Sequence, residues 1–173
     1  MVNIAVLGCG RIGAMHAANV ATHPRTNLEM VFDVNELAVT NVANAHQVQA
    51  ARSAQEVFAS DRVQAVLVAT ATPTHADYIE MAIAAGKPVL CEKPIDLNLE
   101  RVNRCAEVVS ASTVPIQLGF NRRYDPGHAA AREACLAGKI GDLHQVIITA
   151  RDPALPPRAY LEEAGGLFRD MTI

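Results

Sequence analysis

The sequence predicts an α/β fold, in which a doubly wound parallel sheet is followed by the start of an α+β second domain. Three observations lead to this prediction. Short apolar runs alternate with helix-length amphipathic segments through the first 120 residues, a glycine-rich turn follows the first run, and residues 63–70 form the near-continuous apolar run of a strand buried on both faces. With 173 residues, the chain is long enough for one well-cored domain and the beginning of a second.

Each apolar run in the first 120 residues is interpreted as a strand, and each amphipathic segment between two runs as a helix. The fourth helix is expected to start at Thr74, which can cap it, and to stop before Gly86, a residue suited to a helix C-terminus. The expected strands cover residues 2–7, 28–33, a weaker run around 48, 63–70, 89–91 and 116–120. The other expected helices cover residues 11–22, a segment that ends near 45, 54–60 and 99–110.

The pattern changes beyond residue 121, so we expect a first domain over residues 1–121 and a second over 122–173. Asp125 and Pro126 form a good helix start, with proline at the first helical position, and Gly138 can end that helix. Residues 143–150 are expected to form a strand of a different sheet, because no plain crossover leads to them. The proline-rich residues 152–157 are expected to form a loop.

Composition and charge favour a soluble globular protein. Half of the residues are hydrophobic, 19% are charged and the formal net charge is −3, without a basic run, so neither disorder nor nucleic-acid binding is expected. The longest apolar stretch is too short to cross a membrane, and because a strand is expected close to Met1, no targeting peptide is expected. The four cysteines have no CxxC or metal-ligand spacing, so we expect free thiols, no metal site and a cytoplasmic location.

A glycine-rich turn lies between the first expected strand and the first expected helix. Residues Gly8-Cys9-Gly10-Arg11-Ile12-Gly13 match G-x-G-x-x-G. In this motif the glycines allow a tight turn, a close approach of the backbone to a pyrophosphate and close packing of the helix on the strand. The helix N-terminus then offers unpaired N–H groups and a positive dipole end to the phosphates. The turn therefore predicts a Rossmann-type dinucleotide site, and its alternative is a glycine turn without a ligand.

Asp33 supports the dinucleotide interpretation. It lies twenty residues beyond Gly13, at the end of the second expected strand, where a carboxylate can bind a ribose 2′-hydroxyl. A carboxylate also repels a 2′-phosphate, and the following Val34 and Asn35 supply no cation. The expected cofactor is therefore NAD rather than NADP.

Further polar residues follow other expected strands. Because parallel strands end at one edge of a sheet, residues that directly follow them converge there, where ligands of open α/β sheets bind. The candidate cofactor-binding residues at this edge, beyond the glycine turn and Asp33, are Thr72, Pro73, His75, Glu92, Lys93 and Arg122.

Lys93 is the candidate catalytic residue of the first domain, because it directly follows a strand instead of lying on a solvated helix. Its amine could hydrogen-bond a substrate alcohol and favour the alkoxide as hydride leaves. The alternative is an ordinary surface lysine. Glu92 could orient Lys93 or bind the nicotinamide ribose, and the alternative is a solvated carboxylate.

Other polar residues allow two interpretations each. His75 is more typical of a cap or a packing group than of a general base. Arg122 and Arg123 could bind a phosphate or a polyol, or form a structural salt bridge. Asp170, near a helix start, is by itself consistent with capping electrostatics. The remaining histidines have no partner spacing and are expected at the surface: His16, His23, His46, His128 and His144.

At these residues the sequence resembles the glucose–fructose oxidoreductase, inositol dehydrogenase and rhizopine-catabolism (Gfo/Idh/MocA) family, over the whole chain. The EKP and GG-x-F-x-D elements together are specific, and the run FNRRYDP with RDP at 151–153 is most similar to the inositol 2-dehydrogenase branch. The matching segments are GCGRIG at 8–13, ATPTH at 71–75, CEKP at 91–94, GFNRRYDP at 119–126 and GGLFRDMTI at 165–173.

The resemblance implies oxidation of a secondary alcohol of a cyclitol or sugar, with hydride passing to NAD. It implies that Lys93 and Asp170 are catalytic, that Asp152 also binds substrate, and that a histidine one helical turn after Asp170 takes the proton. The sequence ends one residue before that position, so we expect the N-terminal half of a homo-oligomeric enzyme, able to bind NAD with little turnover. The alternatives are another sugar or dihydrodiol dehydrogenase of this family, or a non-catalytic module that senses NAD(H).

Overall fold

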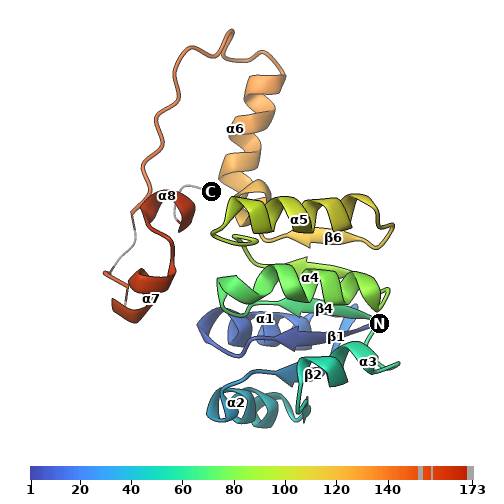
Figure 1. The fold of residues 1–173 in the computed structure, drawn as a ribbon. Coiled ribbons are helices and arrows are strands. Elements are labelled where there is room, and N and C mark those ends of the chain that lie inside the picture. The colour runs from blue at the N-terminus through green and yellow to red at the C-terminus, as the bar shows by residue number, and fades with distance from the viewer. Residues whose placement is uncertain (152–153, 157, 171–173) are drawn as a thin grey trace. The chain divides into compact units, whose positions relative to one another are not determined.

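The computed structural model describes residues 1–151, 154–156 and 158–170. The chain divides into two compact units, Met1–Gly119 and Phe120–Ile173, and each is described by itself (Figure 1).

The first unit contains one six-stranded sheet in the order β3-β2-β1-β4-β5-β6, and every neighbouring pair is parallel (Figure 1). The order reverses direction at β1, from which the chain winds first toward β3 and then toward β6. This is the doubly wound arrangement that the sequence predicts. The strands are β1 Val2–Leu7, β2 Thr26–Phe32, β3 Gln49–Ala50, β4 Ala65–Val68, β5 Val89–Cys91 and β6 Ile116–Leu118.

Helices cover the two faces of the sheet in two groups. Buried side chains of α1 and α2 form one core cluster with Val6 of β1, whereas those of α3, α4 and α5 form another with Ala5 and Leu7. Successive residues of β1 thus point to opposite faces, and both faces are apolar, as expected for a parallel sheet between helices. The helices are α1 Arg11–Thr22, α2 Glu36–His46, α3 Ala54–Ala59, α4 His75–Ala84 and α5 Leu99–Ser110.

The expected cap of α4 is wrong. Thr74 occupies the N-cap position, but its hydroxyl donates to the Ala71 carbonyl at 2.8 Å and lies 2.7 Å from the Thr70 hydroxyl. A 3-10 turn, η1 Thr72–Thr74, leads directly into α4 and gives Thr74 a φ of −103° and a ψ of −8°. In this helical conformation the Thr74 side chain does not reach the first amides of α4. An N-cap residue with an extended backbone would reach them.

The second unit begins with the short helix η2 Asn121–Tyr124 and the helix α6 Pro126–Leu136. Asp125 caps α6, because its carboxylate accepts from the His128 N–H at 2.9 Å, and Gly138 follows it with a φ of +68°. Both features agree with the sequence prediction. Two shorter helices follow, α7 Arg158–Glu163 and α8 Leu167–Asp170.

The strand predicted over residues 143–150 is wrong, since these residues form no ladder in the structure. Val146, Ile147 and Ile148 are 63–80% exposed. A strand exists only where another strand pairs with it, and no other strand lies in the described residues of the second unit. The residue types of this segment could not reveal whether a second strand pairs with it.

Across the described ranges, no helix combines the length and the apolar character needed to span a bilayer.

Candidate cofactor site

Two of the three glycines in the turn after β1 are required by the fold itself. Gly8 has a φ of +95°, and a Cβ on it would overlap the carbonyl group of Ala69 after β4. A Cβ on Gly13 would overlap the carbonyl oxygen of Gly8. These positions permit the tight turn and the close packing of α1 against it, which are the roles predicted for the first and third glycines.

Gly10 is different, because the protein leaves the space beside it empty. Its φ of −68° suits any residue, and no heavy atom lies within 4 Å of the position that a Cβ would take. Gly10 is also the N-cap of α1 and contributes no side-chain cap, so the first amides of the helix receive no hydrogen bond from a cap side chain. The fold gives no reason for a glycine here, whereas a phosphate group approaching the helix N-terminus does.

Asp33 links the end of β2 to the glycine turn. Its Oδ2 accepts from the Cys9 N–H at 2.6 Å, and its Oδ1 accepts from the Asn35 N–H at 2.8 Å. The sequence predicts only a ribose contact for this carboxylate, but the structure shows that it also supports the turn. Burial and the nearby Asp33 charge raise the pKa of the Cys9 thiol to about 12, so this cysteine stays protonated at neutral pH.

His75 joins the segments that follow β4 and β5. The side chain is buried, with Nδ1 2.7 Å from the Pro94 carbonyl oxygen and Nε2 3.0 Å from that of Thr70. Both ring nitrogens therefore face the backbone, which favours the packing role over a general base. Thr72 and Pro73 lie in the 3-10 turn that leads into this helix.

Glu92 and Lys93 directly follow β5, and the Lys93-Pro94 peptide bond is cis. Lys93 is partly buried. Glu92 Oε1 lies 2.7 Å from Nε2 of His16 on α1, and the two side chains are 23% and 19% exposed. The expectation that His16 is a surface residue without a partner is therefore wrong. No spacing rule connects residues 76 positions apart, so the sequence gives no sign of this pair.

The hydrogen bond from His16 is the main cause that lowers the pKa of Glu92 below its ordinary value of 4.5, with help from the Lys93 N–H and against the opposing effect of burial. A carboxylate with a lowered pKa stabilises the fold above its unfolded-state pKa, and this contribution is lost as the pH falls through the folded value. We expect the free energy of unfolding to decrease below about pH 4.5. Urea titrations of wild type and Glu92→Gln between pH 3 and 7 would check this, since the two curves should converge at low pH.

Two of the predicted site residues of the second unit, Arg122 and Asp170, lie on its helices. Arg122 is an exposed residue of η2, and Asp170 Oδ2 accepts a 2.7 Å hydrogen bond from the Tyr160 hydroxyl. Tyr160 is a neighbour of Asp170 that the sequence did not suggest. The predicted substrate residue Asp152 lies outside the described residues. His128 also has a partner, since its Nδ1 lies 2.8 Å from an Asp125 oxygen three positions earlier, although both side chains are half exposed.

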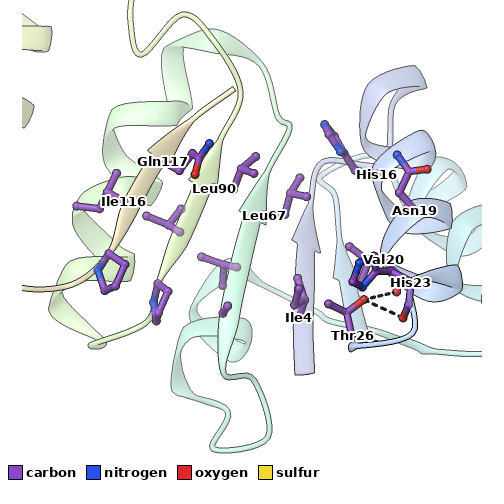
Figure 2. Close-up of a pocket in the computed structure, with 15 residues that line it drawn as sticks. Ile4, His16, Asn19, Val20, His23, Thr26, Leu67, Leu90, Ile116 and Gln117 are labelled. Carbon is purple, nitrogen blue, oxygen red and sulfur yellow. Dashed lines mark hydrogen bonds between the residues drawn. The ribbon is translucent and has the colours of Figure 1, made fainter. Parts of the chain in front are cut away.

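A separate apolar groove of about 530 Å³ lies on the α1 face of the sheet, over β4, β5 and β6. Figure 2 shows Leu67, Leu90 and Gln117 projecting into it from the strands, with His16 and Asn19 of α1 along its border. The topology explains the groove, because the helices after β4 and β5 pack on the other face, as the core clusters show. The groove contains none of the predicted cofactor residues.

A glycine turn between β1 and α1, an aspartate after β2 and polar side chains after β4 and β5 together define a dinucleotide-binding Rossmann domain. The model of an oxidoreductase family with an NAD-binding Rossmann fold, Gfo/Idh/MocA, matches residues 2–120, and the chain belongs to this family. The family assignment, the fold class and NAD as the cofactor are thereby confirmed.

Relatives of known sequence or structure match from 82% to 99% of the chain. Inositol 2-dehydrogenase of Rhizobium meliloti is 44% identical over 99% of this chain and 52% of its own length. A myo-inositol dehydrogenase from Corynebacterium glutamicum superposes with a TM-score of 0.91 at 42% identity, over 99% of this chain and 52% of its own. A scyllo-inositol dehydrogenase from Lactobacillus casei, solved with NAD(H) and scyllo-inositol, gives 0.78 at 30% identity, over 82% of this chain and 43% of its own. The chain thus spans about half the length of these relatives.

Proposed function

We propose that this chain provides the cofactor-binding part of an NAD-dependent dehydrogenase that oxidises a secondary alcohol of a cyclitol such as myo-inositol. The observation that carries the proposal is the empty space beside Gly10 at the N-terminus of α1, which the fold does not require. The inositol dehydrogenases among the relatives support the substrate class.

In this proposal each residue has a defined task. The amides at the start of α1 bind the pyrophosphate, the glycine turn allows its approach, and Asp33 accepts from a ribose hydroxyl. NAD, when bound, supplies the acceptor for the hydride. Lys93 donates a hydrogen bond to the substrate hydroxyl and stabilises the negative charge that develops on its oxygen. Asp170 is assigned to the same alcohol by the family resemblance.

The direct test is a calorimetric titration of the purified chain with NADH and, in parallel, with NADPH. We expect saturable NADH binding and at least about tenfold weaker NADPH binding, since the Asp33 charge opposes a 2′-phosphate. A demonstrably folded sample that binds neither nucleotide would contradict the proposal.

The role of Asp33 in choosing the cofactor can be separated from its role in the turn. In Asp33→Asn the side chain keeps one oxygen that can accept from the Cys9 N–H, but it loses the charge and the second acceptor at the Asn35 N–H. We therefore expect a folded protein with a slightly lower melting temperature, whose preference for NADH over NADPH falls by about tenfold. Asp33→Ala loses both acceptors and should lower the melting temperature further. Calorimetry and thermal unfolding of both variants check the prediction. A preference that stays unchanged in Asp33→Asn would show that this charge does not discriminate.

A further inference from the structure

The backbone of the residues after β5 is held by neighbouring elements on both sides of Lys93. On one side, the Glu92 N–H donates to the carbonyl of Val68, the last residue of β4, at 2.9 Å. On the other side, the Pro94 carbonyl oxygen lies 2.7 Å from Nδ1 of His75, the first residue of α4. Lys93 is therefore the single residue between two backbone attachments.

The ring of His75 has little freedom to move. It is 1% exposed, and its Nε2 lies 3.0 Å from the Thr70 carbonyl oxygen while Nδ1 faces Pro94. The helix that begins at His75 is itself firmly packed, because its residues Ala76 and Ile79 belong to the core of this face of the sheet. The ring is thus a rigid support for the segment after β5.

The two contacts of the ring are not equivalent. A carbonyl oxygen can only accept a hydrogen bond, and a neutral imidazole carries a single N–H. We assign this hydrogen to Nδ1, because its contact with Pro94 is the shorter one, at 2.7 Å against 3.0 Å for Nε2 and Thr70. A partly buried carbonyl that loses its donor becomes an unsatisfied polar group. The bond from Nδ1 therefore opposes any separation of Pro94 from α4.

We propose that His75 is a positioning residue, whose Nδ1–H holds the Pro94 carbonyl and so fixes the backbone on the C-terminal side of Lys93. Together with the bond from the Glu92 N–H, it gives the Lys93 side chain a backbone that is attached on both sides. The use of the Lys93 amine rests on the function proposed above, whereas the attachment of its backbone is a property of this chain alone.

The test compares substitutions of His75 that keep different parts of the ring. Asparagine places a side-chain N–H at the position of Nδ1, and glutamine places one at the position of Nε2. His75→Asn can therefore keep the bond to Pro94, whereas His75→Gln can keep only the contact with Thr70. His75→Leu has nearly the shape of His75→Asn but no donor, which makes it the matched control.

Hydrogen exchange of the Glu92 amide, measured by NMR without cofactor, is the readout. This N–H is bonded to β4, and it becomes accessible to water when the segment that contains Lys93 moves away. The amides of β1, measured in the same samples, report the stability of the whole unit and show that each variant is folded.

Relative to the amides of β1, we expect the Glu92 amide to exchange about tenfold faster in His75→Leu than in His75→Asn. His75→Gln should resemble His75→Leu. A role in packing alone would affect the asparagine and leucine variants alike, so equal rates in these two would overturn the proposal. A Glu92 amide that is better protected in His75→Gln than in His75→Asn would overturn it as well.

The nitrogen NMR spectrum of the wild-type ring is an independent test that needs no variant, because ring nitrogens with and without hydrogen have different chemical shifts. We expect a hydrogen on Nδ1 of His75 at neutral pH, and a ring whose only hydrogen lies on Nε2 would overturn the proposal. Neither measurement contains nucleotide. Failure of the wild-type chain to bind NADH would thus contradict the proposed function and leave both results on His75 valid.

Discussion

Replacing Gly10 by alanine is expected to weaken NADH binding by about 100-fold, or about 2.7 kcal/mol, while the melting temperature stays close to that of the wild type. The fold accepts a methyl group here, because its φ is −68° and nothing lies within 4 Å of a Cβ. The same methyl group would occupy the space through which the backbone approaches a pyrophosphate. Calorimetry with NADH and thermal unfolding of the same samples give the two quantities.

Met15→Ala is the matched control for this prediction. Met15 lies in α1, shortly after the turn, and is 48% exposed. Truncation of its side chain should therefore leave both the affinity for NADH and the melting temperature close to the wild-type values. If Gly10→Ala bound NADH as tightly as the wild type, the turn would not be the place where the backbone approaches the phosphates.

Gly13→Ala is expected to destabilise the fold strongly, whereas Gly10→Ala is expected to leave its stability nearly unchanged. A Cβ at this position would overlap the backbone of Gly8, which cannot move aside as a flexible side chain can. We expect a loss of about 3 kcal/mol in the free energy of unfolding, the upper range for overpacking of a rigid site. At this size of unit the loss corresponds to a fall of roughly 10 °C in melting temperature.

Urea unfolding of Gly13→Ala and wild type measures this loss directly. Saturating NADH should raise the melting temperature of the wild type more than that of the variant, because the displaced turn also forms the cofactor site. A variant with wild-type stability would contradict the close packing of α1 on the turn. The two substitutions thus separate a glycine that serves a ligand from one that serves the fold.

The local sequence pattern was sufficient to predict most helices and strands of the first unit. The strand Val2–Leu7 and the helices Arg11–Thr22 and Leu99–Ser110 begin and end where the sequence predicts. Apolar periodicity, glycines and the topology of parallel strands are properties of short segments, and they identify the glycine turn, Asp33 and the edge where the strands end.

The rest depends on contacts between distant residues. The pairing of His16 with Glu92 joins positions 76 residues apart, and no local pattern spans that distance. The strand predicted over residues 143–150 failed because pairing requires a second strand. Thr74 failed as a cap because the preceding 3-10 turn gives it a helical backbone, which its own residue type does not predict.

The two hydrogen bonds of Asp33 have a consequence for how cofactor preference can change during evolution. The carboxylate accepts from the Cys9 N–H in the glycine turn, so a substitution that removes the negative charge also threatens the turn unless the new residue keeps an acceptor. Asparagine, which places an oxygen at the same distance along the side chain, meets this condition, whereas alanine, leucine and arginine have no acceptor. A change to a 2′-phosphorylated cofactor therefore disturbs the turn least when residue 33 keeps an acceptor oxygen and the cation that binds the phosphate is supplied by another position.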